Sequence, residues 1–109
     1  MIRTDITFSP EAEQFILELA ADAKPTCDII LSYVLKTERI DPATGHRTQS
    51  KGPHIAASLE KAQGDEDAAI LPTSNRAVVL NGFDKVPNAE IVLMTDHPSA
   101  YLAIRSAGH

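Results

Sequence analysis

The side chains best suited to chemistry in this sequence are one cysteine and four histidines. Cys27 is the only cysteine, so the chain cannot form an intramolecular disulfide. A thiol close to an imidazole can act as a nucleophile, and His46, His54 or His97 would then be the base. Cys27, however, stands at the start of an apolar run, where cysteine is usually a small buried hydrophobic residue. We therefore assign no catalytic residue and favour a chain that is not an enzyme.

Asp96 and His97 are adjacent oxygen and nitrogen donors, and Cys27 or His54 would add a third ligand to a transition metal. The sequence has none of the His-x3-His, His-Glu-x2-His or Cys-x2-Cys spacings that preorganise a metal site. The run Asp96-His97-Pro98-Ser99 is also typical of a turn. A metal site at Asp96, His97 and Cys27 is the alternative to that turn, and we expect no cofactor.

Positive charge gathers between residues 36 and 54, where only Glu38 and Asp41 are acidic. A solvated hairpin tip explains this pattern, and a docking surface for an acidic protein partner is the functional interpretation. Lys36 begins the basic segment. The predicted binding residues are Arg39, His46, Arg47, Lys51 and His54.

The whole chain has the opposite charge, −5 at pH 7 with a sequence pI of about 5.2. Such a molecule repels phosphate backbones and anionic lipid. Aromatic residues make up 5% and Trp is absent, so few side chains can stack on bases. We expect neither nucleic acid nor a membrane as a partner.

A length of 109 residues, with 43% hydrophobic and 23% charged residues, predicts one globular domain over residues 1–109. The first residues lack the apolar region of a secretory signal, and no apolar run approaches membrane-spanning length. With a single cysteine, these features lead us to expect a cytoplasmic protein.

The elements that must position these residues begin with a short strand and a helix. Thr4 to Phe8 alternates as a strand does, with Ile6 and Phe8 on one face. Ser9 is a typical N-cap, followed by Pro10 at the first helical position. The apolar residues of the next segment follow helical spacing, and Pro25 predicts a helix end near residue 23. They are Ala12, Phe15, Ile16, Leu19, Ala20 and Ala23.

The rest of the sequence favours strands. Asp28 to Lys36 predicts a central strand, and residues 41–53 have the turn chemistry of a loop. Residues 54–63 fit a strand or a helix, and we favour the strand because residues 27–39 need an antiparallel neighbour. The remaining strands are expected at 68–71, 76–80, 90–95 and 100–105, the first two as a hairpin. We therefore predict an α+β fold, with an N-terminal amphipathic helix packed on a mostly antiparallel sheet of short strands.

The order of these elements resembles that of the A-type iron–sulfur carrier (HesB-like) family. The resemblance starts with Ile6-Thr7-Phe8-Ser9-Pro10-Glu11-Ala12 before an amphipathic helix, and it covers residues 6–20, 29–34 and 65–80. That family has a cysteine soon after its first long strand and a Cys-x-Cys pair near its C-terminus. Residues 37–41 and 106–109 contain no cysteine, and Cys27 precedes the long strand. The resemblance therefore implies a related scaffold without its cluster ligands.

These observations lead to two hypotheses about function. The first is a non-enzymatic accessory or binding module with a protein partner, or a homo-oligomer formed through a free strand edge. The alternative is a metal- or iron–sulfur-associated protein on a HesB-like scaffold that has lost the usual cysteine ligands.

Overall fold

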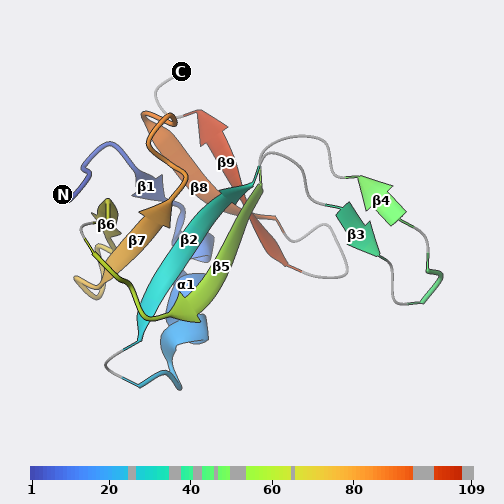
Figure 1. Ribbon diagram of the computed structural model, residues 1–109, viewed down its shortest axis with the longest axis horizontal. Coiled ribbons are helices and arrows are strands. Elements are labelled where there is room, and N and C mark those ends of the chain that lie inside the picture. The colour runs from blue at the N-terminus through green and yellow to red at the C-terminus, as the bar shows by residue number, and fades with distance from the viewer. Residues whose placement is uncertain are drawn as a thin grey trace.

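A computed structural model of the chain describes residues 1–24, 27–34, 38–40, 43–45, 47–49, 54–64, 66–94 and 100–106. For residues 38–40, 47–49 and 106 it describes the backbone alone. The described residues form one short helix and two sheets, so the predicted α+β class is confirmed (Figure 1). The elements are β1 (Thr7–Phe8), α1 (Pro10–Ala20), β2 (Asp28–Val34), β3 (Glu38–Ile40), β4 (Arg47–Gln49), β5 (His54–Glu60), β6 (Ala68–Ile70), β7 (Ala77–Asn81), β8 (Ala89–Met94) and β9 (Tyr101–Ser106).

The larger sheet has the strand order β1-β8-β9-β5-β2-β7-β6. β2 lies inside the sheet, as predicted, because it pairs with β5 on one side and with β7 on the other. Its alternate residues Ile29 and Leu31 are fully buried. Residues 54–60 form the predicted antiparallel partner of β2 and pair with it along their whole length. The hairpin of β6 and β7 is also confirmed, as are the strands expected at 90–95 and 100–105, which pair with each other as antiparallel β8 and β9.

Two parallel pairs were not predicted. β1 runs parallel to β8, and β2 runs parallel to β7. The apolar alternation of a strand shows that one face is buried, but it does not identify the neighbouring strand. Between the described strands the antiparallel pairs β2·β5, β5·β9, β6·β7, β8·β9 and β3·β4 still outnumber the parallel ones.

The N-terminal segment connects the two ends of the large sheet. Ile2 forms a parallel bridge with Ala68 of β6, where the Arg3 amide donates to the Ala68 carbonyl at 2.7 Å. A few residues later, Thr7 and Phe8 pair with β8 at the opposite end of the strand order. The sheet is therefore partly closed, in the manner of a barrel.

In the described part of the chain, β5 and β9 pair over a short stretch. The register joins His54 to Ala103 and Ile55 to Leu102. In the part of the chain that the structure describes, residues 56–60 have a strand partner in β2 alone. The sheet consequently opens at this point.

The helix begins where the sequence predicts. The Ala12 amide donates to Ser9 Oγ at 3.1 Å, so Ser9 is the N-cap and Pro10 the first helical residue. The helix ends at Ala20, three residues before the expected position. Ala12, Ile16 and Ala20 are buried and belong to the same core as the strand residues. Among the described residues no helix has the length and apolarity needed to cross a membrane.

Two regions differ from the sequence-based expectation. The interval 41–53, expected to be a loop, contains β4, which pairs with β3 in a separate two-stranded sheet. Phe83 lies outside every expected strand, yet it is fully buried and packs edge-on against Tyr33 at a ring distance of 5.8 Å. The turn carrying Phe83 therefore belongs to the core.

Candidate functional site

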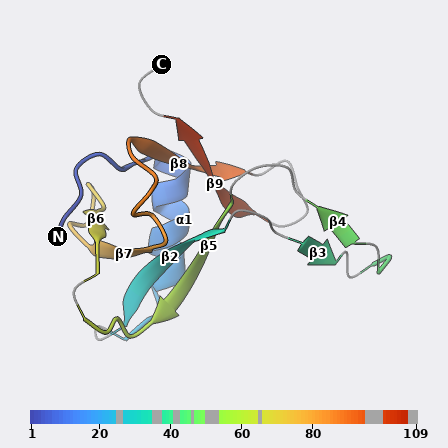
Figure 2. The ribbon, with the colours of Figure 1, turned by 45° about the horizontal axis from the view of Figure 1, so that its top comes forward.

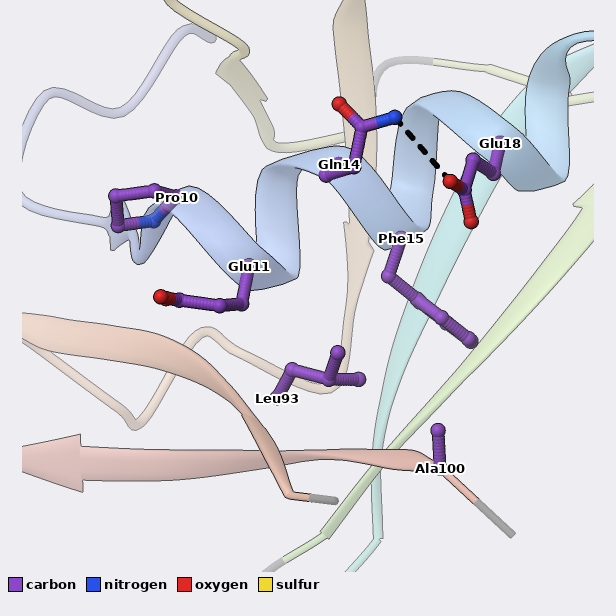
Figure 3. A pocket seen from close by; sticks show the side chains of 7 residues that line it. All are labelled: Pro10, Glu11, Gln14, Phe15, Glu18, Leu93 and Ala100. Carbon is purple, nitrogen blue, oxygen red and sulfur yellow. Dashed lines mark hydrogen bonds between the residues drawn. The ribbon is translucent and has the colours of Figure 1, made fainter.

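One functional candidate among the described residues is an open groove between α1 and the β8–β9 pair, with a volume of about 510 Å³. We call it the groove. Figure 3 shows Phe15 reaching down from the helix towards the space above Leu93 and Ala100. Leu93 belongs to β8, and Ala100 immediately precedes β9. The lining residues are Pro10, Glu11, Gln14, Phe15, Glu18, Leu93 and Ala100.

The elements around the groove fix its width. The Ser9 amide donates to the Ile91 carbonyl at 2.9 Å, which fastens the start of α1 to β8. Phe15 and Leu93 are half-buried and pack against the core, so one side of each supports the fold and the other faces the groove. Leu93 is also paired in register with Leu102 of β9. The apolar floor of the groove is therefore attached to α1 and to the β8–β9 pair.

The rim of the groove is acidic. Glu11 and Glu18 are exposed, and neither forms an ion pair with a described residue. The Gln14 amide donates to Glu18 Oε1 at 3.2 Å, which orients this carboxylate along the rim (Figure 3). Glu18 lies in the last turn of α1, near the negative end of the helix dipole, and this turn contains no basic residue. The rim therefore attracts positive charge.

The third glutamate of the helix has a structural contact instead. Glu13 accepts a hydrogen bond from the Thr73 hydroxyl and another from the Thr73 amide at 2.9 Å. These two bonds lower the pKa of Glu13 below its usual value, the hydroxyl having the larger effect. Glu13 joins the helix to the turn between β6 and β7 and does not line the groove.

A second cavity, of about 460 Å³, lies at the N-terminal segment and is bordered by Arg3, Asp5, Asp67 and Asp84, among others. Arg3 donates to both carboxylate oxygens of Asp5 and to the Phe83 and Val86 carbonyls, at distances of 2.6 to 3.0 Å. The Arg3 hydrogen bonds, and then the Asn88 amide, hold the pKa of Asp5 well below its usual range. These contacts join the N-terminal segment to the turn after β7.

Two of the residues singled out from the sequence have described side chains. His54 lies at the start of β5, is only 7% exposed, and packs edge-on against Tyr101 at 4.9 Å between ring centroids. Cys27 is half-buried, and its carbonyl accepts a hydrogen bond from the Arg76 guanidinium at 2.8 Å. The structure does not bring these two residues together, because they flank opposite ends of the β2–β5 pair.

For the other predicted residues, the structure describes either the backbone alone or nothing. Arg39 lies in β3 opposite Thr48, and Arg47 lies in β4 opposite Ile40. Four further residues, His46, Lys51, Asp96 and His97, are outside the described residues. Within the described ranges no group of three or more His, Cys, Asp or Glu is placed to hold a metal ion. The predicted metal site at Asp96, His97 and Cys27 stays a prediction.

Comparison of the chain with models of protein families, with curated proteins and with solved structures found no match. The HesB-like resemblance, which rests on the order of elements, therefore stays a prediction.

Sequence reasoning missed the groove. The helical spacing groups Phe15 with the other apolar residues of the helix, and it singles out neither Glu11 nor Glu18. One signal was available: Glu18 lies in a last turn that has no basic residue, where a carboxylate costs about 0.3–1 kcal/mol. A residue that destabilises the helix to which it belongs is a candidate for a role outside that helix.

Proposed function

We propose that this chain is a non-enzymatic binding module whose groove accepts an apolar side chain from a basic segment of a partner protein. The observation that carries the proposal is the pairing of an apolar floor, Phe15, Leu93 and Ala100, with two carboxylates on the rim that lack a basic partner among the described residues. An apolar side chain flanked by Lys or Arg complements this arrangement in both shape and charge.

The shape of the groove favours a polypeptide over a small metabolite. Pockets for small ligands are concave and enclose most of the ligand surface. This groove is open along its length, so it can admit one side chain of a longer segment that continues on both sides. The proposal takes α1 as packed on the sheet, and the shared burial of Ala12, Ile16 and Ala20 with strand residues supports that arrangement.

The proposal can be tested with short synthetic peptides and NMR. The probe is acetyl-Lys-Arg-Ile-Arg-Lys-amide, and the controls replace its Ile by Ser or its four basic residues by Glu. We expect the probe to shift the amide signals of Phe15, Glu18 and Leu93 and both control peptides to do so far less. Shifts confined to other parts of the protein, or equal shifts with the acidic control, would contradict the proposal.

A pair of variants links binding to the rim. Glu18→Lys should weaken binding of the probe by about tenfold, because attraction becomes repulsion. It should not destabilise α1, since a cation in the last turn complements the helix dipole. The matched control is Glu66→Lys, which makes the same change of charge at an exposed residue outside the groove. Equal weakening in both variants would mean that net charge alone drives binding.

A further inference from the structure

The edge of β8 beside the groove has no strand partner beyond Ile91 among the described residues. β1 pairs with β8 at Glu90 and Ile91, and the rest of β8 has its strand neighbour in β9. The chain turns into α1 directly after Ser9, and Figures 1 and 2 both show this helix behind the strands of the large sheet. The helix therefore does not fill the place beside β8 that a longer β1 would occupy.

This open edge presents the amide and the carbonyl of Leu93. Peptide groups along a strand point alternately to its two sides. The Ile91 carbonyl accepts from the Ser9 amide on the β1 side, so the Leu93 groups, two residues later, point to that side as well. The β8–β9 register is regular from Ala89 to Met94, so no bulge reverses the alternation. In the part of the chain that the structure describes, no backbone hydrogen bond from the β1 side reaches Leu93.

The open edge adjoins the groove. Pro10 and Glu11, which follow Ser9, line the groove, and Leu93 contributes its side chain to the floor. Leu93 therefore presents an apolar side chain and two backbone groups to the same occupant. An extended segment laid along β8 uses both, because main-chain hydrogen bonds hold such a segment while its alternate side chains enter the pockets beside it.

The carboxylates of the rim match the side-chain spacing of a strand. Figure 3 shows Glu11 and Glu18 following one another along the helix above Leu93 and Ala100. The helical interval between these two glutamates corresponds to about 10 Å. In an extended segment, the residues two places before and two places after an apolar residue share its face and lie about 13 Å apart. Basic side chains at these two positions meet the carboxylates when the apolar side chain enters the groove.

We infer that the groove and the open edge of β8 together bind an extended segment of a partner protein as an added β-strand, with Lys or Arg two positions before and after its apolar residue. The inference rests on the proposed function and adds the conformation and the residue pattern of the bound segment. A second copy that paired β8 with β8 around a two-fold axis would bring two acidic rims together and be repelled.

Two peptides of equal composition test the pattern of charge. The outer-charge peptide, acetyl-Lys-Thr-Ile-Thr-Lys-amide, has its lysines on the same side of a strand as the isoleucine, and the inner-charge peptide, acetyl-Thr-Lys-Ile-Lys-Thr-amide, has them on the opposite side. In NMR titrations of the wild-type chain we expect the outer-charge peptide to bind about fivefold more tightly or better. This preference should fall in Glu18→Lys and persist in Glu66→Lys, which alters an exposed residue outside the groove. Equal affinities for the wild-type chain would overturn the added strand.

Hydrogen exchange tests the backbone pairing. Near saturation, the outer-charge peptide should slow exchange of the Leu93 amide by about tenfold or more, while the Val92 amide, which points to β9, keeps its rate.

Methylation of the peptide backbone tests the same pairing from the other side. A methyl group on the isoleucine amide of the outer-charge peptide blocks antiparallel pairing with Leu93, and one on the amide of the next residue blocks parallel pairing. We expect one of these two methylated peptides to lose about tenfold in affinity and the other to bind like its parent. Equal affinities of the two methylated peptides would contradict strand pairing.

The proposed function and the added strand fail in different ways. Signals of Phe15 and Glu18 that shift without slower exchange at Leu93 would leave side-chain binding in the groove standing and remove the added strand. Absence of shifts at all three residues would remove the proposed function as well. A Leu93 amide that is already protected in the chain alone would show that a second copy or another segment fills the edge, and it would overturn the inference.

Discussion

At the residue scale, Ser9 determines where one wall of the groove begins. Its hydroxyl accepts the Ala12 amide, while its own amide donates to Ile91 of β8. The same residue therefore starts the helix and fastens it to the strand that carries Leu93. A change at Ser9 should affect both the helix and the groove.

We expect Ser9→Ala to lower the free energy of unfolding by about 0.5–2 kcal/mol, because an early helical amide loses its acceptor. Ser9→Asp should retain most of the stability, since a carboxylate caps a helix equally well. Urea unfolding followed by circular dichroism measures both. Equal losses in the two variants would show that Ser9 acts through something other than its cap.

Asp5 makes stability depend on pH. Its pKa is lower in the folded protein than in the unfolded chain, because Arg3 and the Asn88 amide hydrogen-bond to the carboxylate. The stabilisation is therefore complete above the unfolded pKa and disappears as pH falls through the folded value.

Asp5→Asn should consequently destabilise the protein at pH 7, and its difference from wild type should shrink as pH falls below about 4. Urea midpoints across the acidic range measure this difference. A gap that stays constant from neutral to acidic pH would mean that the charge of Asp5 contributes nothing.

At the element scale, the segment between β7 and β8 contributes more to the hydrophobic core than its sequence suggests. Gly82 adopts a φ of +81°, and Phe83 next to it is fully buried beside Tyr33. The left-handed backbone at Gly82 directs the chain so that Phe83 enters the core.

Phe83→Ala should cost about 3–5 kcal/mol, the range for emptying a buried aromatic site. Phe83→Leu fills most of the volume and should cost much less. Chemical denaturation of both variants tests this. A small loss for alanine would contradict the burial of the ring.

Sequence patterns correctly predicted the elements whose signals lie within a few neighbouring residues. Ser9-Pro10 predicts the helix start, and the alternation of Ile29, Leu31 and Tyr33 predicts the central strand. Phe83 was missed because its neighbours Asp84 and Lys85 are polar and give no strand or helix period. The groove was missed because its floor comes from Phe15 and Leu93, whose spatial proximity depends on long-range packing.

At the scale of the whole molecule, Arg3 is the link that holds the N-terminal segment in place. Its side chain is 12% exposed and donates to Asp5 and to the Phe83 and Val86 carbonyls. Together with the Ile2–Ala68 bridge, these bonds keep the two ends of the large sheet connected.

Arg3→Met removes the charged donors but keeps an apolar stem of similar length. We expect a loss of about 1.5–3 kcal/mol, as for hydrogen bonds to charged groups. Hydrogen exchange should speed up at the Ala68 and Asn88 amides while the β2–β5 amides keep their protection. A uniform loss of protection would contradict a local linking role.

The partial closure of the sheet has a consequence for how the chain acquires its fold. Thr7 and Phe8 pair with Glu90 and Ile91, and Ile2 pairs with Ala68, so residues 2–8 depend on residues that are synthesised much later. Contacts so distant in sequence carry a high contact order, which slows folding. During synthesis the N-terminal segment must wait on the ribosome until β8 has emerged, and until then β6 and β8 lack the neighbour that the first eight residues provide.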